Sequence, residues 1–256
     1  MPLLSVDNVT KRFGGLLAND AVSFAVPERT VFAVIGPNGA GKTTLFNAIS
    51  GFFPPTEGRI TFDGADITGL PQRRIAARGL VRTYQLAQLF KDLTAAENVH
   101  VGFHLVTRGA IGAALLRPRW VREQEARIRA ETRDLLAFVG LAAQADMQAD
   151  TLPYGQQRLL EVARALAAQP KLLLLDEPAA GLNTEETAQL ADTILRIRDR
   201  GITVLLIEHD MSLVMRIAQH IVVLDFGKKI AEGTPDEIKA HPEVIAAYLG
   251  TEAAHA

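Results

Sequence analysis

The stretch that decides the fold is GPNGAGKT, residues 36–43, which begins at the last residue of the apolar run VFAVIG. Its pattern, G-x-x-x-x-G-K-[ST], is that of a phosphate-binding loop. Glycines let the backbone curl so that successive N–H groups point inward at phosphate oxygens, and the loop delivers these oxygens to a helix N-terminus. The stretch therefore predicts a strand, a nucleotide-binding loop and a helix over 41–50 that stops at Gly51.

Three side chains of this loop carry specific predictions. Lys42 is expected to contact the β- and γ-phosphates, Thr43 to bind Mg²⁺ through its hydroxyl, and Thr44 to donate to a phosphate. The rest of the predicted nucleotide-binding loop consists of Gly36, Pro37, Asn38, Gly39, Ala40 and Gly41. A glycine-rich turn with an incidental lysine is the alternative. The position between a strand and a helix favours the phosphate loop, because its mechanism needs that context.

A second motif is LLLLDE, residues 172–177, an apolar run that ends in two acids. Such a continuous run is typical of a strand buried on both faces of a parallel sheet. Its carboxylates would lie at the carboxyl edge of the sheet, where ligands of α/β proteins bind. We expect Asp176 to hold Mg²⁺, mostly through water, and Glu177 to act as general base on the attacking water. An acidic surface turn is the alternative, and the nearby phosphate loop makes it less favoured.

The order of elements indicates an α/β fold with an inserted helical segment. Residues 89–168 are rich in Ala, Leu, Arg and Glu with helical spacing, whereas strands and helices alternate in 1–88 and 169–256. The expected strands are 3–13, 21–26, 31–36, 59–64, 80–85, 171–177 and 202–209, with a hairpin over 220–233 that turns at 225–227. The expected helices are 41–50, 122–139, 156–168 and 186–200, with a short helical tail that ends near Leu249. This alternation predicts a mainly parallel sheet with helices on both faces.

Composition excludes several classes of protein. The chain has 256 residues, 48% hydrophobic and 22% charged, which is typical of a globular domain and not of a disordered or fibrous chain. Its 27 basic and 29 acidic residues give a net charge of −2, so we expect no nucleic acid partner. The absence of cysteine excludes disulfides, thiolate metal sites and cysteine nucleophiles. No run of about 18 apolar residues predicts a membrane span, and the N-terminus lacks the features of a signal peptide, so we expect a cytoplasmic address.

A third motif, LPYGQ at residues 152–156, opens a helix between the two others, and together they resemble the nucleotide-binding subunit of an ABC transporter. GPNGAGKT resembles its Walker A motif, LLLLDE its Walker B motif and LPYGQ its signature. The resemblance covers nearly the whole chain. It implies a P-loop NTPase of the ABC ATPase type, a single domain with a mainly parallel core, an N-terminal antiparallel β subdomain and a helical subdomain over 89–168.

The resemblance also assigns residues that are uninformative by themselves. Phe13 stands where the family has its adenine-stacking aromatic, Gln85 resembles the Q-loop glutamine that reaches metal and catalytic water, and His209 resembles the switch histidine. Alone, Phe13 reads as a strand aromatic and His209 as a hydrogen-bonded strand end, while Gln85 carries no signal. The remaining binding residues, in the signature, are Tyr154, Gly155 and Gln156, whose helix N-terminus favours an anion.

Two positions depart from the family pattern. Pro153 stands where the signature usually has a serine, and it offers neither a hydroxyl nor an N–H. Asn183 ends AAGLN, where the family's D-loop usually ends in aspartate. Both changes concern contacts with a partner's nucleotide and leave ATP binding itself untouched. The segment 93–98, LTAAEN, resembles the part that faces the permease. The segment 103–122, with Trp120, is either a packed loop or a contact with lipid headgroups or the permease.

Because each motif occurs once, the resemblance implies that a second ABC ATPase chain completes each ATP site, and we favour a heterodimer. It further implies ATP and Mg²⁺ as ligands, transmembrane permease subunits as partners, a solute-binding protein as an indirect partner, and a peripheral place on the cytoplasmic face of the membrane. The segment 103–122 and the tail resemble importers of branched-chain amino acids. Alternatives are another solute such as urea, amides or lipid, a non-transport ABC-type ATPase, or a P-loop kinase or GTPase.

Overall fold

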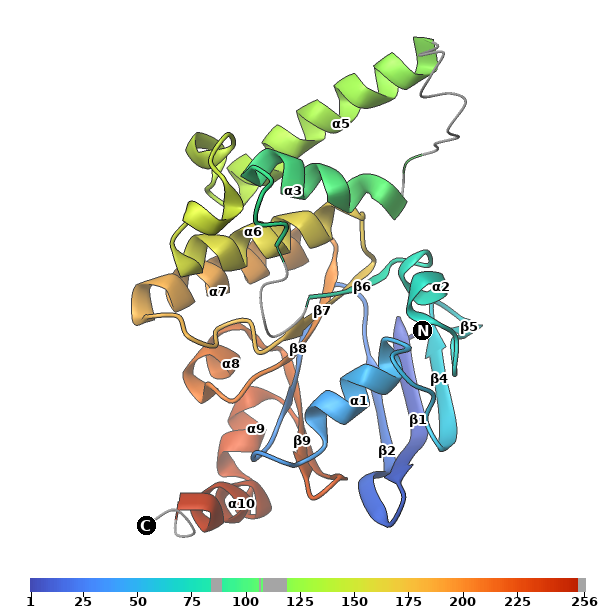
Figure 1. Cartoon of the computed structure of the whole chain (residues 1–256). Coiled ribbons are helices and arrows are strands. Elements are labelled where there is room, and N and C mark those ends of the chain that lie inside the picture. The colour runs from blue at the N-terminus through green and yellow to red at the C-terminus, as the bar shows by residue number, and fades with distance from the viewer. Residues whose placement is uncertain (84–88, 106, 108–118, 253–256) are drawn as a thin grey trace. The chain divides into compact units, whose positions relative to one another are not determined.

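The structure is a computed structural model that describes residues 1–83, 89–105, 107 and 119–252. It divides into two compact units. The first joins Met1–Arg82 to Lys171–Ala256, and the second is Thr83–Pro170. Each is described by itself, with elements labelled as in Figure 1.

The first unit contains a six-stranded sheet in which all neighbouring strands are parallel except β10 and β9, so the predicted mainly parallel sheet is confirmed. In spatial order its strands are β10 (Lys228–Gly233), β9 (His220–Asp225), β3 (Val31–Ile35), β8 (Thr203–Ile207), β7 (Leu172–Asp176) and β6 (Leu80–Arg82). Every residue of β3, β7 and β8 is buried, as their unbroken apolar sequences require. Parallel strands end at a common edge, and this edge receives the phosphate loop after β3 and the two acids at the end of β7, Asp176 and Glu177.

A second, antiparallel sheet lies beside it in the same unit. Its order is β2 (Leu16–Val26), β1 (Leu4–Phe13), β4 (Glu57–Phe62) and β5 (Ala65–Asp66). The helix α1 (Lys42–Ile49) lies between the two sheets (Figure 1), and its Leu45, Phe46 and Ile49 join a core cluster drawn from both. The phosphate loop is therefore held at one end by a buried strand and at the other by a buried helix.

The other helices of this unit are α2 (Gln72–Ala76), α7 (Thr184–Asp199), α8 (Met211–Ile217), α9 (Pro235–Ala240) and α10 (Pro242–Glu252). Short polar side chains set where three of them begin. Asn183, Asp210 and Thr234 each accept hydrogen bonds from N–H groups in the first turn of α7, α8 and α9. The predicted helix over 186–200 is thus confirmed, and it starts earlier because Asn183 and Glu186 form a capping box.

The described part of the second unit is helical, as predicted, and contains α3 (Ala95–Gly102), α5 (Arg119–Phe138) and α6 (Tyr154–Ala167) with single 3₁₀ turns at Phe103–Leu105, Ala142–Gln144 and Ala149–Thr151. The helix α3 was not predicted individually. It is held by the buried Asn98, whose amide donates to the carbonyls of Phe90, Leu93 and Thr94. Gly102 permits close packing on α6, since a Cβ there would stand 2.2 Å from the Arg164 carbonyl oxygen.

Within the part of the chain that the structure describes, no helix is both long enough and apolar enough to cross a membrane.

Candidate active site

A cavity of about 370 Å³ opens at the phosphate loop in the first unit. Its polar lining comes from the loop residues 38–44 and the carboxylate of Glu177. Its apolar lining comes from the start of β2 and the β9–β10 turn. Its lining is Leu16, Leu17, Ala18, Asn38, Gly39, Ala40, Gly41, Lys42, Thr43, Thr44, Glu177, Phe226 and Gly227. The structure therefore brings most of the predicted phosphate-binding residues and the predicted general base to one cavity.

The loop backbone has the curled shape that a phosphate loop requires. Gly36, Gly39 and Gly41 have φ of 148°, 81° and 93°, values that L side chains rarely adopt. At Gly41 a Cβ would stand 2.3 Å from the Ala18 carbonyl oxygen, so only glycine allows the loop to lie against β2. No side chain caps α1, which leaves its N-terminal N–H groups for an anion.

Lys42 lines the cavity and is buried, with 6% of its surface exposed. Its Nζ donates to the carbonyl oxygens of Gly36 at 2.7 Å and Pro37 at 2.9 Å. Burial lowers the pKa of Lys42, and the negative charges of Glu177 and Asp176 oppose that shift. Both hydrogen-bond acceptors are neutral, so an arriving phosphate would offer the buried ammonium a charged hydrogen-bond acceptor.

Asp176 ends β7 and is buried, and its Oδ2 accepts a hydrogen bond from Arg82 Nη2 at 2.6 Å. The Arg82 side chain is buried as well and also donates from Nη1 to Asn47 Oδ1 and Ser50 Oγ, at 2.7 and 2.9 Å. It thus joins the carboxylate to the C-terminal end of α1. Sequence reasoning missed Arg82; the available signal was an arginine at the end of an otherwise apolar β run, LVR, in a sheet where charges need partners.

Glu177 and His209 follow neighbouring parallel strands and face each other. Glu177 has φ of 45°, a strained value for a residue with a long side chain. Its N–H donates to the Ile207 carbonyl at 3.0 Å, which ties the turn after β7 to the end of β8. His209 Nδ1 lies 4.0 Å from Glu177 Oε2. A base and a histidine at this separation could both contact one γ-phosphate and its attacking water.

Glu208, which sequence reasoning also missed, forms hydrogen bonds with both the turn after β7 and the turn after β8. Its side chain is fully buried. Oε1 accepts from the Ala179 N–H at 2.8 Å, and Oε2 accepts from the His209 and Asp210 N–H groups at 3.1 and 3.4 Å. Burial raises the pKa of Glu208, while these N–H donors oppose the rise. An acid directly after the apolar run ITVLLI was the available signal, because a buried carboxylate needs several donors.

We predict that Glu208→Gln lowers ATP turnover about tenfold or more and changes the KM for ATP by less than about threefold. An amide has one oxygen, so it can accept from the Ala179 side or from the His209 side but not from both. One lost hydrogen bond to a charged group is worth about 1.5–3 kcal/mol, and 1.4 kcal/mol of barrier is tenfold in rate. The phosphate loop is untouched, so steady-state kinetics should show the loss in kcat.

The matched control for this variant is Thr203→Val, at the opposite end of the same strand. Thr203 is buried and its Oγ1 accepts from the Arg29 N–H at 2.8 Å. Its loss should cost about 1 kcal/mol of unfolding free energy and leave turnover unchanged. Equal kinetic losses in both variants, or normal kcat in a folded Glu208→Gln variant, would show that Glu208 contributes only to stability.

Other predicted residues stand apart from this cavity. Phe13 does not line it: its ring packs edge-on against Phe53, with centroids 5.4 Å apart, although β1 pairs Phe13 with the cavity residue Leu16. Its adenine contact stays a prediction. Gln85 lies outside the described residues. The signature residues Tyr154, Gly155 and Gln156 open α6 in the second unit, where Tyr154 is exposed and contacts the Arg158 guanidinium.

The two departures from the family pattern have local explanations. Pro153 is the N-cap of α6 and makes no side-chain cap hydrogen bond, so the helix N-terminus there depends on its backbone N–H groups. Asn183 caps α7 by accepting from the Glu186 N–H at 3.0 Å. Asparagine and aspartate are about equally good as N-cap residues, so capping α7 does not require the aspartate that the family usually has here.

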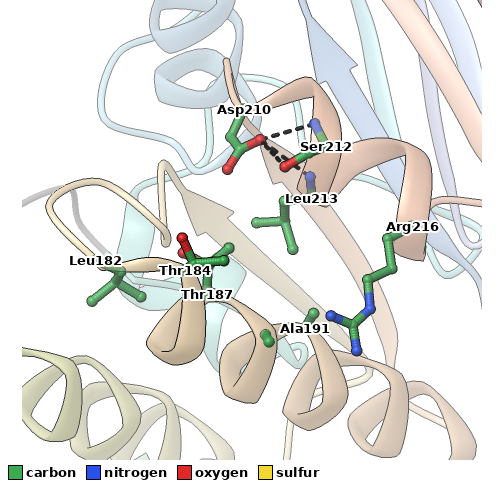
Figure 2. A pocket seen from close by; sticks show the side chains of 9 residues that line it. Leu182, Thr184, Thr187, Ala191, Asp210, Ser212, Leu213 and Arg216 are labelled. Atoms are coloured by element: carbon green, nitrogen blue, oxygen red, sulfur yellow. Dashed lines mark hydrogen bonds between the residues drawn. The ribbon is translucent and has the colours of Figure 1, made fainter.

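A second cavity, of about 360 Å³, lies between α7 and α8 (Figure 2). Asp210 and Arg216 are its charged residues and lie on the α8 side together with Leu213, whereas Leu182 and two threonines lie at the start of α7. The Asp210 carboxylate accepts from Ser212 and Leu213 in the first turn of α8, and Arg216 pairs with Asp192 at 2.8 Å. Because both charges already have protein partners, the hydrolytic chemistry is better supported at the phosphate loop.

Comparison with known proteins extends these observations to the whole chain. Residues 19–180 match the model of a family described as ABC transporter, and residues 228–254 match one described as branched-chain amino acid ATP-binding cassette transporter. The chain is 48% identical over 250 residues to the high-affinity branched-chain amino acid transport ATP-binding protein BraF of Pseudomonas aeruginosa, with 97% of this chain and 98% of the relative covered. It is 46% identical over 252 residues to LivG of Escherichia coli, a protein of the same description, with the same coverage.

Solved structures agree with the sequence relatives. An ATP-binding cassette of an ABC transporter in its ADP conformation superposes with a TM-score of 0.85 at 34% identity, covering 98% of this chain and 99% of that one. A dimeric ATP-binding cassette in a post-hydrolysis state, bound to ADP and Pi, gives a TM-score of 0.76 at 25% identity, with 91% and 98% covered. The antiparallel sheet, the mainly parallel sheet and the helical unit are thus those of such cassettes.

Proposed function

The chain belongs to the ABC transporter family, and on this premise we propose that its phosphate-loop cavity binds and hydrolyses ATP to power a membrane transporter for branched-chain amino acids. The observation that carries the hydrolytic part is the placement of Lys42 and Glu177 on one cavity, with His209 Nδ1 4.0 Å from Glu177. An ammonium for the phosphates and a carboxylate for the attacking water are the two groups that such a reaction needs at close range.

In this proposal the triphosphate lies along the loop backbone, at the N-terminus of α1. Lys42 Nζ, which donates to two carbonyl oxygens in the structure, donates instead to oxygens of the β- and γ-phosphates. Glu177 polarises a water that attacks the γ-phosphorus, and His209 contacts the γ-phosphate beside it. The bond from the γ-phosphorus to the bridging oxygen breaks, ADP and phosphate leave, and the proton of the water passes to Glu177 and then to solvent.

The donor chemistry of the site fits Mg²⁺, which prefers oxygen ligands and keeps several of its waters. We propose Thr43 as a hydroxyl ligand, Asp176 as a carboxylate that acts mostly through water, and Gln85 as a further oxygen donor. No cluster of three or more His, Cys, Asp or Glu side chains that could hold a metal occurs among the described residues. The ion would therefore arrive with the nucleotide, whose phosphate oxygens complete its shell and whose charge it neutralises.

The signature residues Tyr154, Gly155 and Gln156 are proposed to meet the ATP of a partner cassette, with backbone N–H groups in place of the serine hydroxyl that Pro153 lacks. A dimeric relative bound to ADP and Pi supports a dimer of cassettes. We favour a heterodimer that docks on transmembrane permease subunits at the cytoplasmic face of the membrane and works with a solute-binding protein through them. Closure on ATP and opening after hydrolysis would then drive the permease between its two states.

The solute assignment rests on the relatives rather than on the cavity. Two relatives named for branched-chain amino acid transport match over 97% of this chain, and residues 228–254 match a family model with the same solute in its description. We expect the permease and the solute-binding protein, rather than this chain, to select the amino acid.

The membrane complex that co-purifies with this chain, reconstituted in vesicles, should transport leucine, isoleucine and valine only when ATP is on the side of the chain. The physical reason is that hydrolysis is the sole energy source in such a preparation. The measurement is uptake of labelled leucine, with and without an excess of urea, a short amide or lipid as competitor. Mass spectrometry of the same complex should identify a second, different cassette chain.

A complex with the Lys42→Ala variant is the control for ATP dependence. ATP-dependent movement of urea or an amide, and none of leucine, would support the alternative solute. Purification with nucleic acid and without membrane subunits would support a non-transport ATPase instead, and a single cassette species would support a homodimer.

A further inference from the structure

The turn between β9 and β10 contains a residue that its backbone does not favour. Lys228 pairs with Asp225, so the loop consists of Phe226 and Gly227 alone. Both have positive φ, 42° and 81°, as a type I′ hairpin turn requires. Asn-Gly is the sequence typical of such a turn, and a bulky residue with positive φ is an outlier. The ring of Phe226 is also 85% exposed, so packing in the described chain does not explain it.

This turn is fixed directly to the phosphate loop. The Gly227 N–H donates to the Ala40 carbonyl at 3.1 Å, and the Gly227 carbonyl accepts from the Asp20 N–H at 2.9 Å. β9 runs parallel to β3, with Val223 opposite Ile35, so the strand that feeds the turn and the strand that feeds the loop end side by side. Phe226 is therefore held at the rim of the nucleotide cavity by backbone contacts on both of its sides.

The lining of the cavity is amphiphilic, and Phe226 is one of its apolar residues. Lys42, Thr43 and Glu177 are polar or charged, whereas Leu16, Leu17, Ala18 and Phe226 are apolar. A nucleotide has the same division, with a charged triphosphate and a flat aromatic base. If the triphosphate contacts the polar lining residues and the base contacts the apolar ones, the base lies against the group that includes Phe226.

We propose that Phe226 is a base-contacting residue of the nucleotide site, whose ring covers the base of the bound ATP. The proposal rests on the proposed function of the cavity. It adds a residue whose strained backbone holds an aromatic ring where the base would bind. Strain of this kind persists at binding sites when it holds a side chain where a ligand needs it.

The test is Phe226→Asn in the full 256-residue chain, since asparagine suits the turn and removes the ring. Calorimetry should show ATP binding weakened about 5- to 10-fold, the range expected for the loss of one partly exposed aromatic contact with a base. Binding of inorganic tripolyphosphate, which has no base, should change by less than about twofold. Without nucleotide, the melting temperature should rise by about 2–4 °C as the turn relaxes.

Two further variants separate the ring from the backbone. Phe226→Tyr keeps an aromatic ring and should bind ATP within about twofold of wild type. Trp120→Gln removes an exposed aromatic from α5, in the other unit, and should leave both affinities unchanged.

An unchanged ratio of ATP to tripolyphosphate affinity in Phe226→Asn, a lower melting temperature in that variant, or weak ATP binding by Phe226→Tyr would each overturn the proposal. If the wild-type chain itself binds no ATP, the function proposed for the cavity fails, which is a distinguishable result.

Discussion

Lys42→Ala should abolish ATP hydrolysis and weaken ATP binding about 100-fold while the chain stays folded. Lys42 is the only cationic residue among those that line the described cavity, so its loss leaves the phosphates with uncharged donors alone, the loop backbone and the Thr44 hydroxyl. Each charge-assisted hydrogen bond is worth about 1.5–3 kcal/mol, and an ammonium that contacts two phosphates loses more than one of them. Phosphate-release kinetics and calorimetry would measure the two effects.

The fold should survive because the substitution also removes the cost of burying an ammonium. Burial lowers the pKa of Lys42, which means that the folded chain disfavours its charged form. This gain in the free energy of unfolding offsets the loss of the hydrogen bonds to Gly36 and Pro37. Circular dichroism should therefore show a wild-type spectrum. Lys171→Ala is the matched control, since Lys171 is an exposed lysine paired with Asp63 just before β7. A folded Lys42→Ala chain that hydrolyses ATP at the wild-type rate would exclude the loop from the mechanism.

Glu177→Gln should slow hydrolysis by about 10²–10⁴-fold and leave ATP binding intact. Glutamine keeps the size and hydrogen bonding of the side chain but cannot take a proton from the attacking water. Since ATP is then bound but not cleaved, a dimer of cassettes should accumulate with Mg·ATP. Light scattering after size exclusion would detect it.

The control for this charge change is Glu185→Gln in the exposed first turn of α7, which should hydrolyse ATP normally. Normal turnover by Glu177→Gln would show that the base lies elsewhere. His209, with Nδ1 4.0 Å from Glu177, would then be the next residue to substitute.

Local sequence determined the elements that carry the chemistry. The strand, loop and helix around GPNGAGKT were predicted within one residue, because glycine conformations and a helix start depend on neighbours in the chain. The turn at 225–227 was likewise predicted, although the strain at Phe226 was not, since Phe-Gly reads as a turn whether or not its φ angles are positive. The short helices α2, α3 and α8 were missed, because five to eight residues give too little periodicity to recognise.

The contacts around Asp176 and Glu208 were decided by the tertiary structure. Arg82 and Asp176 are 94 residues apart and meet because β6 and β7 are parallel neighbours in the sheet. Glu208 reaches the Ala179 N–H because β7 and β8 pair with Asp176 opposite Ile207, which sets the following turns side by side. Neither pairing follows from residue order, since a strand's own sequence specifies burial but not its neighbour.

The sequence by itself therefore determined that this chain has a phosphate loop, a buried strand ending in two acids and a signature helix, because each is written in consecutive residues. Only the tertiary structure decided that Glu177 and Lys42 share a cavity, that Arg82 and Glu208 hold the acid and histidine turns, and that Phe13 stays outside while Phe226 lies at the rim. The physical reason is that consecutive residues fix backbone conformation and capping, whereas strand order and register fix which distant side chains meet.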